Sequence, residues 1–426
     1  MKSNTLLLIF FSLFSFIRAE NITISKAYSL ALENSKHIKS SSYQLEANKE
    51  QLTQIETDFY PQLYLSGNYG KKQYGTSGFG NSRGYTLSLQ QSIYNPDTLN
   101  RIDIEKSKIK ISTSAFQLQK QELSQTVLQL YIDILKSKNK IKLYDTYRNS
   151  QADKLRLVEK KYEMRLSNKM DLLQGKVNYH FSEIDILKEK KMLKLNRLKL
   201  KHLIGRESIT LPNINFSPID ISTLQQMEDS VSIEKNRLSN LKIEQAQEAV
   251  HLSQQEIEAA SDGHLPTISL SAQYSKIVAD KSVSSLENTK SIMLQLQIPI
   301  YRGGKTESKI ASAKLAYSSK QEELLQVQDD INEEYEERLL LFNTSVHSLI
   351  LYQEALKSAN LYMDAIQQGL DNGLKSIIQL NDAKDKLYEV RFKYNENIYD
   401  MISAYIRLLV LTNNLENLNI VDKIIL

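Results

Sequence analysis

The sequence predicts a mainly α-helical protein with a small β part, built from two tandem copies of one structural unit. Three observations support this fold class: a pair of motifs recurs about 205 residues later, long stretches carry apolar residues at every third or fourth position, and short stretches alternate between apolar and polar residues. The composition agrees, because only 13 glycines and 6 prolines occur among 426 residues, which favours long unbroken helices.

The N-terminus carries an export signal. Lys2 precedes a run of about a dozen mostly apolar residues that ends at Ile17, and Ala19 is the small residue expected before a cleavage site. The run is short for a helix that spans a membrane, which needs about 20 residues, so a membrane anchor is the less favoured alternative. We therefore predict a signal peptide over residues 1–19 and an exported mature chain.

Two pairs of short segments reveal the duplication. The segment PQLYLSGNY at Pro61 matches PTISLSAQY at Pro266, and LSLQQSIY at Leu87 matches LQLQIPIY at Leu294. The two offsets, 205 and 207 residues, are nearly equal and the order is the same, so chance is a poor explanation. The predicted organisation is a first repeat over residues 20–211, a linker over 212–227, a second repeat over 228–414 and a C-terminal tail over 415–426.

Each repeat contains the same succession of helices around a pair of strands. Leu324, Val327 and Ile331 step by three or four positions, close to a coiled-coil repeat, and the apolar residues between Leu123 and Ile141 do the same in the first repeat. The predicted helices cover about residues 25–58, 97–165 and 169–204 in the first repeat, and about 228–262, 304–371 and 376–411 in the second.

The stretches between these helices alternate as β-strands do. In residues 85–93, Tyr85, Leu87 and Leu89 project to one side, and the residues between them are polar. Residues 267–275 and 292–300 alternate in the same way, and each strand has about 9 to 11 residues, the length that crosses a bilayer when tilted. Tyrosines gather at the strand ends, as in an interfacial belt: Tyr60, Tyr69, Tyr85, Tyr94, Tyr274 and Tyr301.

A half-buried sheet in a soluble protein shows the same alternation and is the alternative interpretation. Two features favour a membrane: the polar side of the strands is largely uncharged, and the chain carries an export signal. Four strands cannot close a barrel, and an open sheet edge in lipid leaves backbone groups unpaired at several kcal/mol each. If the strands span a membrane, several chains must share one barrel. Two chains give eight strands with a filled interior, and three give twelve with room for an aqueous lumen.

At this point the chain resembles the TolC family of outer-membrane efflux and secretion channels. The resemblance covers essentially the whole mature chain and rests on the duplicated order of elements and on three motifs: LPTISL at 265–270, PIYRGG at 299–304 and GLKSIIQLNDA at 373–383. It implies a homotrimer with a TolC-like α-helical periplasmic barrel, continuous with a 12-stranded outer-membrane β-barrel of four strands per chain.

The resemblance also implies a location, a function and partners. It implies an outer-membrane protein with a long periplasmic extension, which acts as the passive exit duct of a tripartite efflux pump or a type I secretion system. The implied partners are outer-membrane lipid, a periplasmic adaptor (membrane fusion) protein and an inner-membrane transporter of the RND or ABC type, which supplies the energy. The family implies no cofactor and no catalysis.

Family members carry a gate near the second hairpin tip, where aspartates ring the narrowest point. Asp382 resembles one such position, and Gln379 stands where the second aspartate is expected. A ring of three carboxylates instead of six attracts cations less strongly. An acidic residue near a helix turn is otherwise simply solvated, which is the alternative role for Asp382.

The resemblance assigns adaptor contacts to the two hairpin tips. The tip residues are Ser167, Asp171, Gly373, Leu374 and Ser376. Arg165 departs from the family, because glycine is usual at this position of the first hairpin and Gly373 is the matching residue of the second. Adaptor docking at the first hairpin therefore differs in detail from the family pattern.

Residues 299–306 raise a separate question, because Gly304, Lys305 and Thr306 are the last three residues of a phosphate-binding P-loop. That motif needs another glycine five positions earlier, where Pro299 stands with no N–H group and a fixed φ. We interpret Pro299, Gly303 and Gly304 as a strand-to-helix junction. Lys305 and Thr306 are then expected in the first, solvated turn of the long helix.

Other chemistry finds little support. The absence of cysteine excludes disulfides, thiolate metal sites and cysteine nucleophiles. The six histidines lie far apart in the sequence, and a net charge of +4 gives no reason to propose a nucleic acid partner. We predict that the protein is not an enzyme. The competing hypothesis is a secreted coiled-coil scaffold or surface adhesin, which explains the helices and the export signal but not the duplicated strands.

Overall fold

A computed structural model describes residues 22–73, 78–206, 210–212, 221–231, 240–279, 288–418 and 420–421. The chain divides into two compact units. One unit, called the hairpin unit below, comprises Met1–Ser35, Gln121–Glu234 and Tyr335–Leu426. The other, called the sheet unit, comprises Lys36–Lys120 and Lys235–Glu334.

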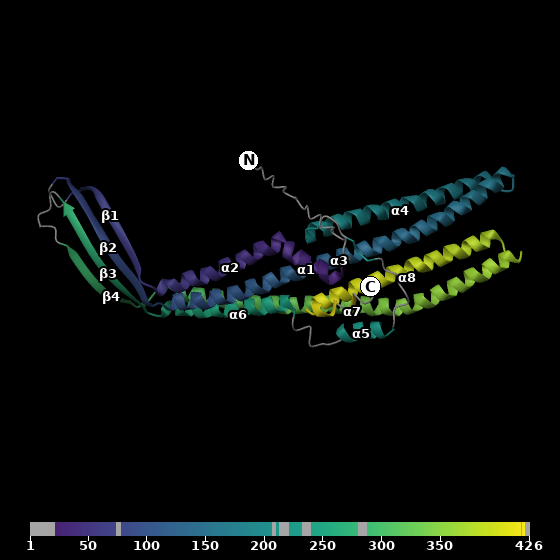
Figure 1. The fold of residues 1–426 in the computed structure, drawn as a ribbon. Coiled ribbons are helices and arrows are strands. Elements are labelled where there is room, and N and C mark those ends of the chain that lie inside the picture. The colour runs from purple at the N-terminus through teal and green to yellow at the C-terminus, as the bar shows by residue number, and fades with distance from the viewer. Residues whose placement is uncertain are drawn as a thin grey trace, which may run out of the picture. The chain divides into compact units, whose positions relative to one another are not determined.

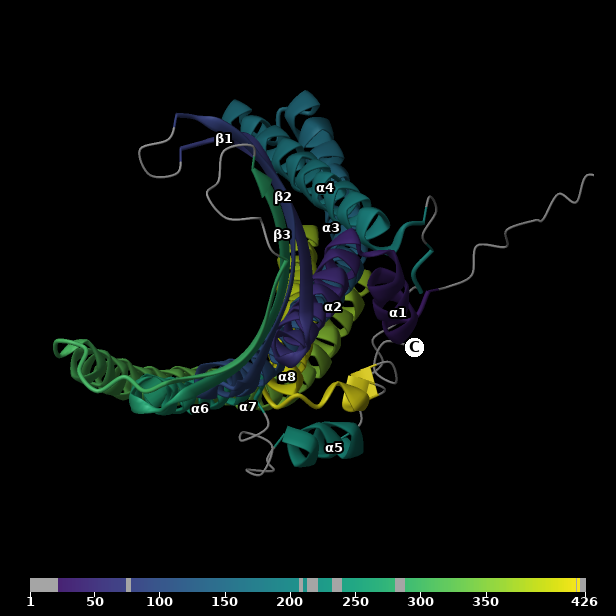
Figure 2. The same cartoon turned by 90° about the vertical axis from the view of Figure 1, so that its left-hand side faces the viewer.

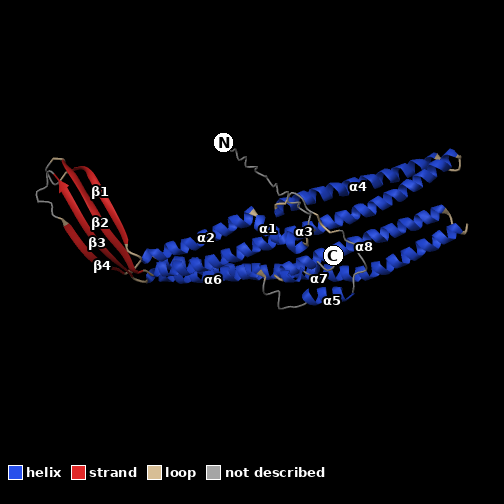
Figure 3. Cartoon of the chain, in the orientation of Figure 1, coloured by secondary structure: helices blue, strands red, loops and turns tan. Residues whose placement is uncertain are grey.

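The order of elements repeats once along the chain (Figures 1 and 3). The first copy contains α1 (Ile24–Asn34), α2 (Lys36–Glu56), η1 (Thr57–Phe59), β1 (Gln62–Lys72), β2 (Gly80–Tyr94), α3 (Pro96–Glu163) and α4 (Lys169–Ile204). The second contains α5 (Ile221–Val231), α6 (Leu241–Ser261), η3 (Asp262–His264), β3 (Thr267–Ala279), β4 (Thr289–Gln297), α7 (Lys305–Asp371), α8 (Ile377–Leu411) and η4 (Leu415–Asn417). The predicted mainly helical fold with duplicated strand pairs is confirmed.

Three predicted element boundaries are wrong. The first helix divides at Ser35, whose backbone is extended and whose N–H donates to the Ala31 carbonyl at 2.9 Å. The helix predicted to begin near residue 228 begins at Leu241 as α6, because the Asn240 side chain accepts a hydrogen bond from the Lys242 N–H at 2.9 Å and caps it. The fourth strand ends at Gln297 rather than residue 300, because Pro299 has no N–H for the strand ladder.

A helix also occupies part of the predicted linker. Helix α5 covers Ile221–Val231, and its Leu224 and Met227 side chains are buried in the apolar core of the hairpin unit. A short amphipathic helix with two core side chains gives a weak signal beside the long heptad-like stretches. For this reason the sequence pattern alone did not reveal α5.

The four strands form one antiparallel sheet in the order β1-β2-β3-β4, and Figure 2 shows it as a curved layer. Within each copy the two strands are a hairpin, and the copies join where β2 pairs with β3. A register shift between Ser92 and Tyr94 interrupts that central ladder just before α3 begins.

The hairpin unit is held by an apolar core to which α1, α3, α4, α5, α7 and α8 contribute. Its largest fully buried side chains include Tyr131, Phe342, Tyr399 and Tyr405. The Tyr131 hydroxyl donates to the Ile22 carbonyl at 2.8 Å, and the Tyr399 hydroxyl accepts from Asn139 Nδ2 at 2.9 Å. Because each of these buried phenols has a hydrogen-bond partner, the core contains large side chains without a desolvation penalty for their polar ends.

Candidate functional site

The pairing register places the apolar stripes of all four strands on the same face of the sheet. Leu65 lies opposite Leu87, which lies opposite Tyr274; Leu270 lies opposite Leu294. Directly opposed residues share a face, so the stripes align across the sheet. The apolar residues of this face are Leu63, Leu65, Leu87, Leu89, Ile268, Leu270, Ala272, Ile292, Leu294 and Leu296, and the same register also places Tyr85, Tyr274, Gln91, Lys276 and Lys290 on it.

The opposite face of the sheet is polar and almost free of charge. The Thr86 and Ser275 hydroxyls lie 3.1 Å apart on this face and share a hydrogen bond. Its residues are mainly serine, threonine and glutamine: Gln62, Ser66, Thr86, Ser88, Gln90, Ser269, Ser271, Gln273, Ser275, Gln295 and Gln297. One face therefore suits contact with hydrocarbon and the other suits contact with water.

Among the residues that the structure describes, both outer edges of the sheet are unpaired. In this part of the chain β1 pairs only with β2, and β4 pairs only with β3. The apolar face is also uncovered, since Leu65 is 74% exposed and Ile292 is 80% exposed. Such an exposed apolar patch marks an interaction surface. Among the described residues, no helix is long and apolar enough to cross a membrane.

The chain passes from β4 into α7 through the predicted junction. Pro299 follows the strand directly, and Gly303 and Gly304 have φ angles of 64° and 79°, which side chains other than glycine adopt only with strain. The expectation that Thr306 is solvated is wrong, because its side chain is only 2% exposed, while Lys305 beside it is exposed. Thr306 is buried because it packs against Gly263 after α6.

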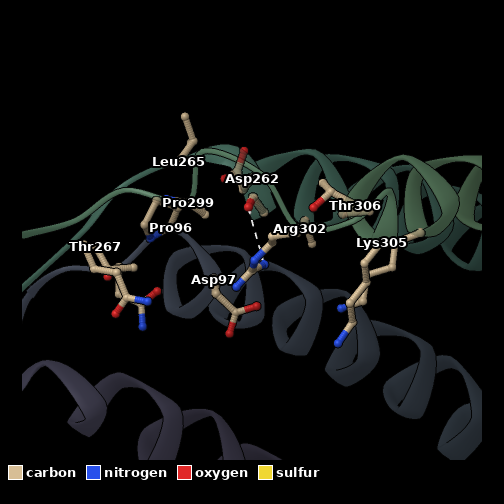
Figure 4. A pocket seen from close by; sticks show the side chains of 15 residues that line it. Pro96, Asp97, Asp262, Leu265, Thr267, Pro299, Arg302, Lys305 and Thr306 are labelled. Atoms are coloured by element: carbon tan, nitrogen blue, oxygen red, sulfur yellow. Dashed lines mark hydrogen bonds between the residues drawn. The ribbon is translucent and has the colours of Figure 1, made fainter.

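A polar pocket of about 320 Å³ lies at this junction (Figure 4). Its walls are the start of α3, the end of α6, the adjacent ends of β3 and β4, and the start of α7, all within the sheet unit. Arg302, Lys305 and Lys309 line it, together with the carboxylates of Asp97 and Asp262. The sequence motif at residues 299–306 pointed to this place without revealing the cavity.

The two helical hairpins, α3–α4 and α7–α8, turn in the same way at their tips. In the first, the Leu166 N–H donates to the Lys161 carbonyl at 2.7 Å; in the second, the Leu374 N–H donates to the Gly369 carbonyl, also at 2.7 Å. The residue before each leucine is left-handed: Arg165 has φ 59° and Gly373 has φ 72°. Both tips thus use a Schellman-type cap, and only the second has the glycine that it favours.

The helices that leave the tips begin with side-chain caps. Asn168 Oδ1 accepts from the Asp171 N–H at 2.8 Å. In the second hairpin Ser376 Oγ accepts from the Gln379 N–H at 3.2 Å, and Gln379 Oε1 accepts from the Ser376 N–H at 2.9 Å. This capping box explains a glutamine at position 379 without reference to a gate.

The remaining predicted tip residues lie at the exposed end of each hairpin. Ser167 Oγ donates to Asp171 Oδ2 at 2.9 Å, which holds that carboxylate against the tip. Asp382 lies one turn beyond Gln379 on α8, and its exposed carboxylate contacts no charged partner in the described part of the chain. The structure therefore brings the tip residues together in two small groups, and it keeps Pro299, Gly303 and Gly304 in the other unit.

Sequence reasoning missed a ladder of ion pairs between α3 and α8 in the hairpin unit. Lys136 pairs with Asp400 at 3.0 Å and Lys140 with Glu396 at 2.7 Å. Towards the tips the ladder continues with two tilted or edge-on ring contacts, Tyr144 with Phe392 and Tyr147 with Tyr388, and a third ion pair, Lys154 with Asp385. The sequence contained one signal for this ladder. Two lysines, Lys136 and Lys140, and two acidic residues, Glu396 and Asp400, are each four positions apart.

The charge of the ladder depends on pH. The hydrogen bond from Lys140 holds the pKa of Glu396 below its usual value. The pKa of Glu396 is therefore lower in the folded chain than in the unfolded chain. The ion pair stabilises the fold fully above about pH 4.3, the usual pKa of a glutamate, and this stabilisation is lost as the pH falls through the lowered pKa. Glu396 is nearly half exposed, so solvent screening keeps the contribution of the pair small.

Within the described ranges, no group of three or more His, Cys, Asp or Glu residues is placed to hold a metal ion. The candidate site therefore consists of three features: a sheet with one apolar and one polar face and open edges, a polar pocket at the strand-to-helix junction, and two hairpin tips.

Comparison with known proteins assigns the chain to a class. The model of the family described as outer membrane efflux protein matches residues 27–206 and 233–414. The chain therefore belongs to the outer membrane efflux protein family, a family of outer-membrane channel proteins, and it is an outer-membrane protein.

Individual relatives agree with this assignment over nearly the whole chain. The chain is 22% identical to the outer membrane protein TolC of Vibrio cholerae over 96% of its own length and 94% of the relative. It is 23% identical to the alkaline protease secretion protein AprF of Pseudomonas aeruginosa, over 89% and 82% of the two chains.

Solved structures share the fold. The outer membrane channel CmeC of Campylobacter jejuni superposes with a TM-score of 0.78 at 16% identity, covering 92% of this chain and 85% of that one. CusC superposes with a TM-score of 0.77 at 19% identity, covering 92% of each chain.

The strained tip gives a first prediction. Replacing Arg165 with glycine should stabilise the first hairpin by about 1 kcal/mol, because glycine adopts the left-handed conformation without a Cβ penalty. Guanidinium unfolding followed by circular dichroism measures the change. The control is Gly373→Ala, which should destabilise the second hairpin by a similar amount; a stability loss in Arg165→Gly contradicts this explanation.

Proposed function

We propose that the protein is the outer-membrane exit duct of a tripartite efflux pump or type I secretion system, a passive homotrimeric channel rather than an enzyme. The observation that carries the proposal is a four-stranded sheet with one apolar face, one uncharged polar face and two unpaired edges. The secreted scaffold hypothesis gives such a sheet no role.

Trimerisation follows from the edges. Hydrocarbon offers no water to pair with backbone N–H and C=O groups, so β1 and β4 need strands of other chains as neighbours. Three copies give twelve strands in a closed barrel, with the apolar face towards lipid and the polar face around a water-filled lumen. The strands have 9 to 15 residues, enough to cross the hydrocarbon layer when tilted.

Helix α4 supports the same assembly in the hairpin unit. Exposed apolar residues, most of them three or four positions apart, run along it: Met170, Leu173, Val177, Phe181, Ile184, Leu187, Met192, Leu195 and Leu198. Such a stripe is buried by another helix in a stable protein. We assign its cover to a second copy of this chain, since the sheet edges already require neighbouring copies.

The hairpin tips are the proposed docking place for a periplasmic adaptor and, through it, an inner-membrane transporter of the RND or ABC type. Leu166, Met170 and Leu374 are each more than 70% exposed there, and an apolar tip side chain is a suitable anchor for a partner. Two relatives are by name protease secretion proteins, AprF and PrtF, and BepC is an efflux protein, so both kinds of cargo occur among similar chains.

Asp382 is the proposed gate residue. Its carboxylate is exposed near the second tip and free of ion pairs with described residues, as a group that faces a pore would be. Three copies would bring three carboxylates towards the same axis and attract cations there. Gln379 is proposed to act only indirectly, by holding the start of α8 through its capping box.

The direct test is conductance. The purified mature protein, added to a planar lipid bilayer, should insert and conduct in steps of uniform size, because identical trimers form identical pores. An absence of steps from protein shown to be folded by circular dichroism rejects the channel.

The two faces of β4 give a sharper prediction. Leu294→Lys places a charge on the apolar face and should cost about 2–4 kcal/mol near the bilayer centre, reducing the amount of assembled protein in outer membranes. Gln295→Lys, one residue further, places the same charge on the polar face and should assemble normally. Equal yields of the two variants in membrane fractions contradict the assignment of the faces.

The gate gives a further prediction. Asp382→Ala should raise single-channel conductance or weaken block by divalent cations, because it removes the carboxylates at the constriction. Asp364→Ala, an exposed aspartate further along the same hairpin on α7, is the matched control and should change neither. Unchanged behaviour of Asp382→Ala in both measurements removes Asp382 from the gate.

A further inference from the structure

The junction pocket gathers three cations that have no charged partners. Arg302, Lys305 and Lys309 all line it, and Figure 4 shows Lys305 at the start of α7 and Arg302 in the preceding turn. Lys305 and Lys309 form no ion pair within the described residues, and Arg302 donates one N–H to the Gly263 carbonyl at 3.4 Å.

Backbone N–H groups at the start of α7 provide further hydrogen-bond donors beside these basic side chains. The Lys305 N–H donates to the Arg302 carbonyl and the Ser308 N–H to the Gly304 carbonyl. The N–H groups of Thr306 and Glu307, the second and third residues of α7, have no backbone partner in the described chain. This is usual, because the first N–H groups of a helix have no carbonyl one turn before them. The positive end of a 67-residue helix and its free N–H groups favour an anion at this place.

Thr306 adds a side-chain hydroxyl to the pocket. Its side chain is 2% exposed, lines the pocket, and has no hydrogen-bond partner among the described residues. The side chain is almost wholly buried, but its Oγ1 is not sealed from the pocket, so the hydroxyl can donate to an anion bound there. Gly263 leaves the room for it, since a Cβ there would lie only 3.2 Å from Thr306 Cγ2.

The two carboxylates of the pocket already have roles. Asp262 Oδ2 accepts from Asn100 Nδ2 at 2.8 Å. Asp97 lies in the first turn of α3, where a negative side chain complements that helix's own positive end. The first turn of α7 also contains an acidic residue, Glu307, and its start differs from that of α3 in the three basic side chains that line the pocket.

The three cations occur in only one of the two copies. At the offset that aligns Tyr94 with Tyr301, the counterparts of Arg302, Lys305 and Lys309 in the first copy are Asn95, Thr98 and Ile102. The first copy passes from β2 to α3 through Asn95 alone, whereas the seven residues 298–304 separate β4 from α7. The basic cluster therefore belongs to the longer passage of the second copy.

We propose that the pocket binds a small soluble oxyanion of the phosphate class, held by Lys305, Lys309, Arg302, the Thr306 hydroxyl and the first N–H groups of α7. Thr267 and Gln297, which pair on the polar face of the sheet, also line the pocket, so it opens on that face. The pocket lies inside a channel lumen only if the proposed function holds, whereas the binding of phosphate to the pocket does not depend on that function.

The test is a calorimetric titration of inorganic phosphate into the purified full-length protein in detergent. The parent should bind phosphate, and the double variant Lys305→Gln/Lys309→Gln should bind at least about tenfold more weakly, because two charge-assisted hydrogen bonds are lost. Thr306→Val keeps the shape of the side chain and should weaken binding by about three- to tenfold. Lys314→Gln, an exposed lysine further along α7, is the control for net charge and should bind like the parent.

Three outcomes overturn the proposal: no measurable heat with the parent, equal affinity in the double variant, or equal weakening in Lys314→Gln. Phosphate is also the chemistry of a lipid headgroup, so a second arm measures flotation with phosphatidylglycerol and phosphatidylcholine vesicles. Loss of phosphatidylglycerol binding in the double variant, without any change in phosphate binding, overturns the soluble ligand in favour of lipid. The titration measures phosphate binding without measuring conductance. A failure of the binding proposal can therefore be distinguished from a failure of the channel proposal.

Discussion

The pairing of strand edges is the constraint on which the rest of this molecule depends. A backbone N–H or C=O that enters hydrocarbon unpaired costs several kcal/mol, and the sheet has two complete edges, along β1 and β4. One chain cannot meet this requirement with four strands. The proposed trimer meets it by joining the β4 edge of one copy to the β1 edge of the next, and the duplication within the chain supplies two strand hairpins for each copy.

The two faces of the sheet then acquire opposite environments from the same register. Each strand alternates, but only the pairing of β1 with β2, β2 with β3 and β3 with β4 brings the four apolar stripes to one side. A one-residue slip in any ladder would exchange the faces of the strands beyond it. The helices depend on a different kind of order, in which the core of Tyr131, Phe342, Tyr399 and Tyr405 holds the hairpin unit and ion pairs connect α3 to α8.

Much of the fold could be predicted from the sequence because its signals are periodic and long. Helix α4 covers residues 169–204 as predicted, and α7 begins within one residue of its predicted start. The errors fall where a single local interaction decides, such as the extended backbone at Ser35 or the missing N–H of Pro299. Helix α5 was missed because its stability comes from packing into a distant core rather than from its own pattern.

The candidate site was less predictable, and the reasons differ from residue to residue. The capping box of Ser376 and Gln379 has a sequence signature, a serine followed three positions later by glutamine, so the local role of Gln379 was accessible. The burial of Thr306 was not, because it depends on Gly263, which lies 43 positions earlier and is brought close only by the pairing of β3 with β4. The pairing of Lys140 with Glu396 is likewise a product of tertiary structure.

The measurement that tests the central claim most directly is cross-linking across the sheet edges. The chain contains no cysteine, so Tyr64→Cys on β1 and Gln295→Cys on β4 would be its only thiols. Treatment of outer membranes with a short bis-maleimide should yield a ladder of covalent species that ends at three chains, while either single variant should yield none beyond one. A ladder that continues past three chains, or the absence of cross-links in correctly inserted protein, would contradict a closed barrel built from three copies.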